Sequence, residues 1–175
     1  NQNKKSVINS KEVLGGKGIN LAQMAKLGLP VPPGFTISTK VCEYFYKNNK
    51  KIPKKVIQEA KREINVIEKI SKKKFGDLSN PLLVSVRSGS RVSMPGMMDT
   101  ILNLGLNDKT VIALKNETSN GRFAKDSYRR LIQMYGNVVL GIELHFFEEL
   151  IENFKLTKGV IQDTELDEED WDGLI

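Results

Sequence analysis

One lysine of this chain stands among glycines at a spacing that could hold a phosphate. Residues 14–18 read Leu-Gly-Gly-Lys-Gly, and a helical pattern of apolar residues follows directly, formed by Leu21, Met24, Ala25 and Leu27. A glycine-rich turn that runs into a helix directs backbone N–H groups and the positive end of the helix dipole toward one point. Lys17 would add a mobile point charge there. The spacing matches neither G-x-x-x-x-G-K-[ST] nor G-x-G-x-x-G, and solvent-facing turns use the same residue types.

A second candidate for anion binding follows an apolar strand. Residues 82–86 read Leu-Leu-Val-Ser-Val, and Arg87 comes next, before a loop rich in serine and glycine and a Met-Pro-Gly turn. An arginine at the end of a strand presents a planar fork to an anion, and small residues let backbone N–H groups approach closely. This combination suits a polyphosphate, although an ordinary strand with a surface arginine has the same pattern. The predicted phosphate-loop residues are Gly16, Gly18, Ser88, Gly89 and Gly96.

Three longer runs carry a resemblance to a known family. They are residues 14–35 (LGGKGINLAQMAKLGLPVPPGF), 84–108 (VSVRSGSRVSMPGMMDTILNLGLND) and 123–140 (FAKDSYRRLIQMYGNVVL). On these runs the chain resembles the pyruvate, phosphate dikinases, at the start of their ATP-grasp nucleotide-binding domain. The phosphoenolpyruvate synthases share the Gly-Lys and Val-Arg-Ser features but lack the Met-Pro-Gly-Met-Met-Asp-Thr run, so the dikinases are the better match. Ser90 departs from the alanine that is usual in the family.

The resemblance implies a fold and an activity. The expected fold class is α/β (α+β), as a partial domain of ATP-grasp type. A full-length dikinase converts ATP, phosphate and pyruvate into AMP, pyrophosphate and phosphoenolpyruvate through a pyrophosphorylated and then a phosphorylated histidine. The family assigns its residues that match Lys17 and Arg87 to ATP binding, so both are expected to bind ATP here. The chain is expected to be a cytoplasmic dikinase segment that is inactive alone.

Other parts of the dikinase site are expected outside this sequence. In the family, the acidic Mg²⁺ ligands and the phosphohistidine, which has a Thr-Ser-His setting, lie further along. His145 is the only histidine here and lies in Glu-Leu-His-Phe-Phe, so it is not expected to carry phosphate. No catalytic residue and no metal ligand is therefore assigned to this chain. The implied partners are ATP, Mg²⁺, the phosphohistidine domain of the same enzyme and a second subunit of a homodimer.

Several further side chains have two interpretations. The three methionines of residues 94–98 are pliable and could shield phosphoryl transfer from water, or they could pack in an ordinary core. Asp99 could touch Mg²⁺, although a role in capping or pinning the loop is favoured. Arg129 and Arg130 could contact phosphate or a neighbouring domain, but arginines on a surface helix are more often solvated.

Positive charge is concentrated in the first part of the chain. Residues 1–75 hold 17 Lys or Arg and 5 Asp or Glu, whereas residues 76–175 hold 10 and 16, with seven acids and no base in residues 163–172. A basic half leaves open a stand-alone module that binds an anionic partner such as RNA, without catalysis. However, aromatic residues are not interleaved with the lysines, and those of residues 53–74 lie on the polar face of an expected helix. A solvated face, with no nucleic-acid partner, is therefore favoured.

The composition limits the architecture and the surroundings. With 175 residues, 39% of them hydrophobic, the chain can form one medium-sized domain or two small ones. No apolar run is long enough to cross a bilayer and no signal peptide opens the sequence, so no membrane partner is expected. Cys42 is the only cysteine, which excludes an internal disulfide and fits a reducing cytoplasm. Its neighbours Val41 and Phe45 favour apolar packing over a reactive thiol.

The pattern of apolar, capping and breaking residues predicts mixed elements before residue 106 and mainly helices after it. The expected helices cover residues 18–27, 39–49, 53–74, 120–140 and 146–154. A short helix capped by Asp108 and a helix after residue 166 are also expected, and Thr39 is the expected cap of the helix 39–49. The expected strands cover residues 35–38, 82–86 and 100–104. One side of the helix 120–140 is expected to carry Phe123, Ser127, Leu131, Met134, Tyr135 and Val138. The predicted parts are thus 1–106, the mixed α/β part of an ATP-grasp nucleotide-binding domain, and 107–175, a mainly helical subdomain.

Overall fold

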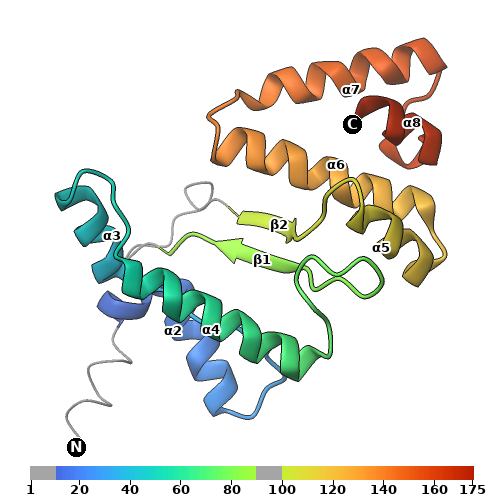
Figure 1. The fold of residues 1–175 in the computed structure, drawn as a ribbon. Helices are drawn as coiled ribbons and strands as arrows, with labels where there is room; N and C mark the ends of the chain where they lie inside the picture. Colours follow the sequence, from blue (N-terminus) through green and yellow to red (C-terminus); the bar gives the residue numbers. More distant parts are fainter. Residues whose placement is uncertain (1–10, 90–99) are drawn as a thin grey trace, which may run out of the picture. The chain divides into compact units, whose positions relative to one another are not determined.

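A computed structural model describes residues 11–89 and 100–175 of the chain (Figure 1). Helices dominate the described residues, and two short strands lie in the middle of the sequence. The elements are α2 (Lys11–Lys26), α3 (Thr39–Lys47), α4 (Lys54–Ser71), β1 (Val84–Arg87), β2 (Thr100–Leu104), α5 (Thr110–Thr118), α6 (Gly121–Val138), α7 (Leu144–Lys158), the 3₁₀ turn η1 (Asp163–Glu165) and α8 (Glu168–Leu174). The chain therefore mixes helices with a small sheet, as the sequence predicted for an α+β partial domain.

The chain forms two compact units. Among the described residues, the first unit comprises residues 11–72 and 88–89, and the second comprises Lys73–Arg87 and Thr100–Ile175. The second unit holds both strands together with α5–α8. The expected boundary near residue 106, between a mixed α/β part and a mainly helical part, stays a prediction.

In the first unit, α2 bends at a glycine. Gly15 adopts φ 70° and ψ 172°, which is outside the helical region, so α2 consists of two helical runs that meet at this residue. The second run contains the helix predicted over residues 18–27. It ends where expected, because Gly28 follows with φ 76°, a left-handed conformation that glycine adopts without strain.

The predicted strand over residues 35–38 is wrong. These residues have no strand assignment, and Phe35 and Ile37 are 41% and 54% exposed. A strand requires a neighbour that accepts and donates its backbone hydrogen bonds, and no strand pairs with this segment among the described residues. The apolar residues that suggested a strand belong instead to an extended connection between α2 and α3.

The next two helices follow the prediction with corrected ends. The N-cap of α3 is Ser38 rather than Thr39, which is the first helical residue. Cys42 on this helix is exposed, so the expected apolar packing of its thiol is wrong: the alternation of apolar residues did not reveal which face of α3 lies outward. The helix α4 begins after Pro53 and ends before Lys72, whose φ of 57° stops it short of the predicted residue 74.

The sheet of the second unit is an antiparallel pair. Val86 pairs with Ile101 and Arg87 with Thr100, and a bulge lies between Val84 and Val86. β2 has the predicted bounds, whereas β1 begins two residues later than predicted and includes Arg87. Ser85, Val86 and Arg87 are exposed, so only the start of this strand is partly covered.

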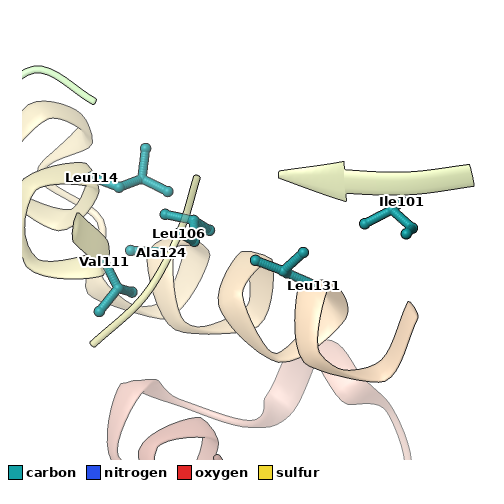
Figure 2. Close-up of a cluster of buried hydrophobic side chains, with 6 residues drawn as sticks. All are labelled: Ile101, Leu106, Val111, Leu114, Ala124 and Leu131. Atoms are coloured by element: carbon teal, nitrogen blue, oxygen red, sulfur yellow. The ribbon is translucent and has the colours of Figure 1, made fainter. Parts of the chain in front are cut away.

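One face of α6 carries the main core of the second unit. Figure 2 shows this cluster, which joins residues of β2, of the connection after it, of α5 and of α6: Ile101, Leu106, Val111, Leu114, Ala124 and Leu131. Of the side predicted for this helix, Ser127 and Leu131 are buried, but Phe123 and Tyr135 are 47% and 42% exposed. The buried face is displaced toward Ala124 and Gly136, because small residues let the neighbouring elements approach the helix axis.

Side chains other than the expected aspartate cap α5. The side-chain oxygen of Asn107 accepts hydrogen bonds from the backbone N–H groups of Lys109 (2.9 Å) and Thr110 (3.0 Å). Asp108 instead accepts one from the hydroxyl of Tyr128 at 2.8 Å. Burial raises the pKa of Tyr128 to about 12, and the hydrogen bond to Asp108 is the second cause. α6 begins after Asn120, whose side chain caps it by accepting from the N–H of Phe123.

A second, smaller cluster lies at the end of the chain. Ile151, Leu166 and Trp171 are buried together, and Trp171 and Leu166 have no exposed surface. α7 is longer than predicted, and α8 confirms the helix expected after residue 166. None of the helices that the structure describes is long and apolar enough to span a membrane.

Candidate functional site

The Gly-Gly-Lys-Gly segment forms the kink of α2. Gly15 takes a backbone conformation that is open almost only to glycine, and Gly15 and Gly16 are both buried. Because a new helical run starts after Gly15, residues 16–18 stand in its first turn, where backbone N–H groups lack partners within the helix. Lys17 is half-buried in this turn. The arrangement offers N–H donors and one ammonium group at the start of a helix, which is suited to an anion.

Another segment of the first unit packs against this kink. A Cβ built on Gly18 would lie 3.1 Å from Cγ2 of Thr36 and 3.2 Å from Cβ of Leu14, so no larger residue fits here without displacement. The hydroxyl of Thr39 donates a hydrogen bond to the backbone carbonyl of Glu12. Sequence reasoning did not find these two threonines, because neither the proximity nor the bond follows from local patterns.

The loop after β1 also reaches the kink. A Cβ built on Gly89 would lie 3.9 Å from the carbonyl oxygen of Leu14, within the first unit. Ser88, its neighbour, is exposed. The two glycine-bearing segments singled out in the sequence are thus side by side at Leu14 and Gly89. Gly96, the three methionines of residues 94–98 and Asp99 lie outside the described residues.

The two expected ATP-binding cations belong to different units. Lys17 lies on α2 in the first unit, whereas Arg87 is the last residue of β1 in the second. Arg87 is exposed and lies opposite Thr100 in the sheet. Lys17 is half-buried in the first turn after the kink. Their convergence on one ligand stays a prediction.

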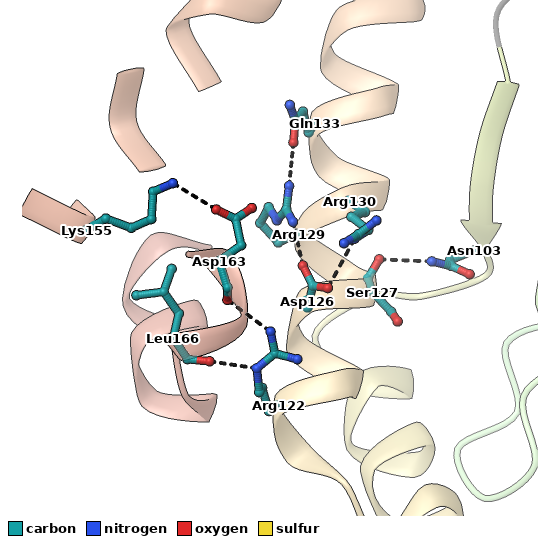
Figure 3. A network of polar contacts seen from close by, with 10 residues as sticks. All are labelled: Asn103, Arg122, Asp126, Ser127, Arg129, Arg130, Gln133, Lys155, Asp163 and Leu166. Carbon is teal, nitrogen blue, oxygen red and sulfur yellow. Dashed lines mark hydrogen bonds and ion pairs between the residues drawn. The ribbon is translucent and has the colours of Figure 1, made fainter. Parts of the chain in front are cut away.

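Arg129 is a structural residue of α6, which corrects the expectation that it is solvated. Its guanidinium lies 2.5 Å from a carboxylate oxygen of Asp126 and donates to Gln133 at 2.7 Å (Figure 3). Its side chain is only 12% exposed. Arg130 also donates to Asp126, at 3.1 Å, but its side chain is 56% exposed, as expected for a solvated arginine. Asp126 therefore pairs with both arginines, and these ion pairs lie within α6.

The acidic stretch of residues 163–172 is held by basic side chains of three helices. Glu168 pairs with Lys115 of α5 at 2.5 Å, and Asp172 pairs with Lys125 of α6. On α7, Lys155 lies 3.0 Å from Asp163, and Lys158 contacts both Asp167 and Asp170. Arg122 adds hydrogen bonds to the backbone carbonyls of Leu166 (2.8 Å) and Asp163 (2.9 Å) (Figure 3). The acids thus dock the end of the chain within its own unit.

These contacts shift the protonation of the groups involved. The hydrogen bond to Asp170 is the main cause that raises the pKa of Lys158. The backbone N–H of Asp170 is the main cause that lowers the pKa of Asp167, with Lys158 second. Asp167 and Asp170 also cap α8 reciprocally, each accepting from the other's N–H. These shifts follow from helix capping and docking of α8.

A shallow hollow in the second unit is lined by residues 74–79. Its carboxylate, Asp77, accepts hydrogen bonds from the N–H groups of Asn80 (2.9 Å) and Ser79 (2.8 Å) and from the Ser79 hydroxyl (2.7 Å). These bonds, the one from Asn80 first, lower the pKa of Asp77 to about 2. The carboxylate is therefore used by its own turn, and none of the predicted site residues lines the hollow.

The remaining candidate groups were the histidine and the acids. His145 is exposed, with Nδ1 3.1 Å from a carboxylate oxygen of Glu143 and its ring centroid 4.0 Å from that of Phe146. Across residues 11–89 and 100–175, no group of three or more His, Cys, Asp or Glu side chains is arranged to hold a metal ion.

The sequence was compared with those of known proteins. The family model described as pyruvate phosphate dikinase, AMP/ATP-binding domain matches residues 11–74. The chain is 53% identical to a pyruvate, phosphate dikinase of Entamoeba histolytica over 161 residues, which are 92% of this chain and 18% of that protein. It is 52% identical to the pyruvate, phosphate dikinase of Rhizobium meliloti over 93% of this chain and 18% of the relative. A chloroplastic pyruvate, phosphate dikinase of Flaveria pringlei is 52% identical over 94% of this chain and 17% of the relative.

The matched family domain contains the kink of α2, Lys17 and both threonines that contact α2. The chain spans less than a fifth of the length of the curated relatives named above. Similarity over about nine-tenths of the chain, together with the matched domain, confirms the resemblance found in the sequence: the chain belongs to the pyruvate, phosphate dikinase family and carries its AMP/ATP-binding domain segment.

Proposed function

We propose that this chain supplies part of the ATP site of a pyruvate, phosphate dikinase. The observation that carries the proposal is the kink at Gly15, which starts a helical run at residues 16–18 with Lys17 in its first turn and Gly89 beside it. Backbone N–H groups at a helix start and an adjacent ammonium group favour phosphate oxygens. The match of residues 11–74 to an AMP/ATP-binding domain supports the same ligand.

Each residue of the proposed site has a distinct task. Lys17 neutralises charge on a phosphate as a point charge, and the N–H groups of Gly16 and Gly18 bind its oxygens. Arg87 contributes a planar fork that binds two oxygens at once. In phosphoryl transfer, such groups position the reactants and stabilise the charge that develops on the oxygens. Mg²⁺ would add charge neutralisation when bound, but its ligands belong outside the residues described here.

The proposed whole enzyme converts ATP, phosphate and pyruvate into AMP, pyrophosphate and phosphoenolpyruvate. Its phosphoryl relay needs a histidine in another domain, because His145 lies in Glu-Leu-His-Phe-Phe and not in the Thr-Ser-His setting of the family's phosphohistidine. This domain and a second subunit of a homodimer are the proposed protein partners, and the cytoplasm is the proposed location. The ATP-grasp fold and the assignment of the phosphate loop to Gly16, Gly18, Ser88, Gly89 and Gly96 belong to the same proposal.

The test uses the full protein encoded by the reading frame that contains this sequence. Phosphoenolpyruvate formation from ATP, phosphate and pyruvate is measured for the wild type, Lys17→Ala and the control Lys26→Ala, an exposed lysine of the same helix. Loss of activity by about 100-fold or more is expected for Lys17→Ala, as for removal of one transition-state donor, and none for the control. Near-normal turnover of Lys17→Ala refutes the assignment. RNA binding that falls steeply with salt, without any effect of ATP, would favour the basic-module alternative.

A further inference from the structure

Residues 36–39, which end at the first residue of α3, contact α2 on both sides of its kink. Thr39 donates its hydroxyl hydrogen bond to the carbonyl of Glu12, which lies before Gly15. Thr36 packs against Gly18, which lies after Gly15: a Cβ on Gly18 would lie 3.1 Å from Cγ2 and 3.3 Å from the hydroxyl oxygen of Thr36. One short segment of the first unit thus touches both helical runs of α2, where α3 begins beside it (Figure 1).

A kink made by glycine needs contacts of this kind to have a fixed angle. Glycine has no Cβ and visits many backbone conformations at similar energy, so Gly15 alone does not hold the two runs at one angle. The last carbonyls of a helical run lack partners inside it, and the hydroxyl of Thr39 binds such a group at Glu12. On the other side, Gly18 lets Thr36 approach the helix closely.

The hydroxyl of Thr39 does not cap its own helix, and the side chain of the N-cap residue makes no capping hydrogen bond either. The N-cap of α3 is Ser38, with the extended conformation (φ −66°, ψ 150°) that an N-cap position requires. Thr39 is the first helical residue, and its side chain reaches across to α2 instead of to the backbone of α3. The bond therefore links the two helices and serves no local purpose.

We propose that Thr39 and Thr36 are positioning residues for the ATP site, which set the angle of the kink and thereby the direction of Lys17 and of the N–H groups of residues 16–18. This inference rests on the proposed function. Neither threonine contacts the phosphate. They act by keeping the first turn of the second helical run aimed at the place where a phosphate binds.

The first test separates the hydroxyl of Thr39 from its size. Thr39→Val removes the donor and keeps the shape, whereas Thr39→Ser keeps the donor. In the full protein, equilibrium dialysis with ATP and magnesium should give a Kd about five- to ten-fold higher for Thr39→Val, the size of one lost hydrogen bond. Thr39→Ser should stay within about two-fold of the wild type. Thr157→Val is the matched control, because that hydroxyl donates to the carbonyl of Asn153, 2.9 Å away in its own helix.

The second test uses the contact between Gly18 and Thr36. Gly18→Ala should weaken ATP binding, because the new methyl group displaces Thr36 from the helix. Thr36→Ala should also weaken it, by loosening the contact. The Kd for ATP of the double variant should rise by less than the product of the two single fold-increases, because the smaller residue at 36 makes room for the added methyl group. This cycle keeps the inference testable if Thr39→Val fails to fold.

Lys17→Ala distinguishes failure of this inference from failure of the proposed function. If Lys17→Ala weakens ATP binding while Thr39→Val binds like Thr39→Ser, the threonines are not positioning residues and the proposed site stands. A lower melting temperature of Thr39→Val with an unchanged Kd for ATP contradicts the inference in the same way. So does a double variant of Gly18 and Thr36 whose fold-increase in Kd equals the product of the two single fold-increases. If Lys17→Ala binds ATP normally, the proposed function itself is wrong.

Discussion

The guanidinium carbon of Arg129 lies 4.6 Å from the centroid of the Trp171 ring, so the last helix of the chain is joined to α6 by a cation–π contact. The ring is completely buried, together with Ile151 and Leu166. A carboxylate oxygen of Asp126 lies 2.5 Å from the same guanidinium. The position of α8 is therefore fixed by one aromatic residue and by the ion pairs around it.

Replacing this ring should destabilise the second unit strongly. We expect Trp171→Ala to lower the free energy of unfolding by about 3–5 kcal/mol, as for other buried aromatic residues. The control is Leu156→Ala, since this side chain on α7 is 76% exposed and its loss should change little. Urea titrations followed by circular dichroism measure both variants. Equal unfolding midpoints for Trp171→Ala and the wild type would show that α8 is not docked as described.

A second prediction concerns the close approach of α6 and α7. A Cβ on Gly136 would lie 2.6 Å from Cζ of Phe147, too close for the ring to remain in place. Gly136→Ala should therefore cost about 1–3 kcal/mol of unfolding free energy, as overpacking does, and Phe147→Leu should restore part of it. Gly173→Ala is the matched control, because open space surrounds that glycine. If both glycine variants unfold at the same denaturant concentration, the helices are not in contact at Gly136.

The kink of α2 gives a third prediction. Gly15→Ala places a side chain at φ 70° and ψ 172°, which should cost about 1–3 kcal/mol or straighten the helix. Hydrogen exchange of the amides in residues 11–26 should become faster. Gly34→Ala is the control, since nothing lies within 4 Å of the added Cβ. Unchanged exchange in Gly15→Ala would mean that the kink does not require glycine.

Asp77 predicts a pH dependence with a defined sign. Its pKa is about 2 in the folded chain, below the ordinary value of 3.8. The folded state therefore binds fewer protons than the unfolded state between these values, so the stabilisation by Asp77 is complete above the ordinary pKa and disappears as the pH falls through about 2. Asp77→Asn should keep the turn but lose this dependence. The measurement is the difference in unfolding free energy between wild type and variant against pH, and a difference that does not change with acidification contradicts the assignment.

Helix ends that depend on a residue only a few positions away could be predicted from the sequence. Gly28 marks the end of α2 and Asn120 marks the start of α6, whereas the kink at Gly15 was not predicted. The prediction that Asp108 caps α5 failed, because Tyr128, a distant residue, donates a hydrogen bond to Asp108. The apolar pattern of residues 35–38 resembled a strand, but a strand depends on a partner that no local pattern reveals.

Contacts between distant residues could not be predicted in this way. Arg129 looked like a surface residue of a helix, and only the folded chain brings Trp171 against it. Thr36 and Thr39 carry no motif, yet they touch both runs of α2. The resemblance supplied Lys17 and Arg87 as ATP-binding residues, and their role stays a prediction.

The central claim is that Lys17 and Arg87 bind the phosphates of one nucleotide. Its most direct test is the Kd for ATP and for AMP of the full protein, measured for the wild type, Lys17→Ala, Arg87→Ala and the control Lys26→Ala. The account predicts that both site variants lose at least about ten-fold in ATP affinity, as for a lost charge-assisted hydrogen bond, and clearly less in AMP affinity, while the control is unchanged. ATP affinity equal to that of the wild type in either site variant would contradict it.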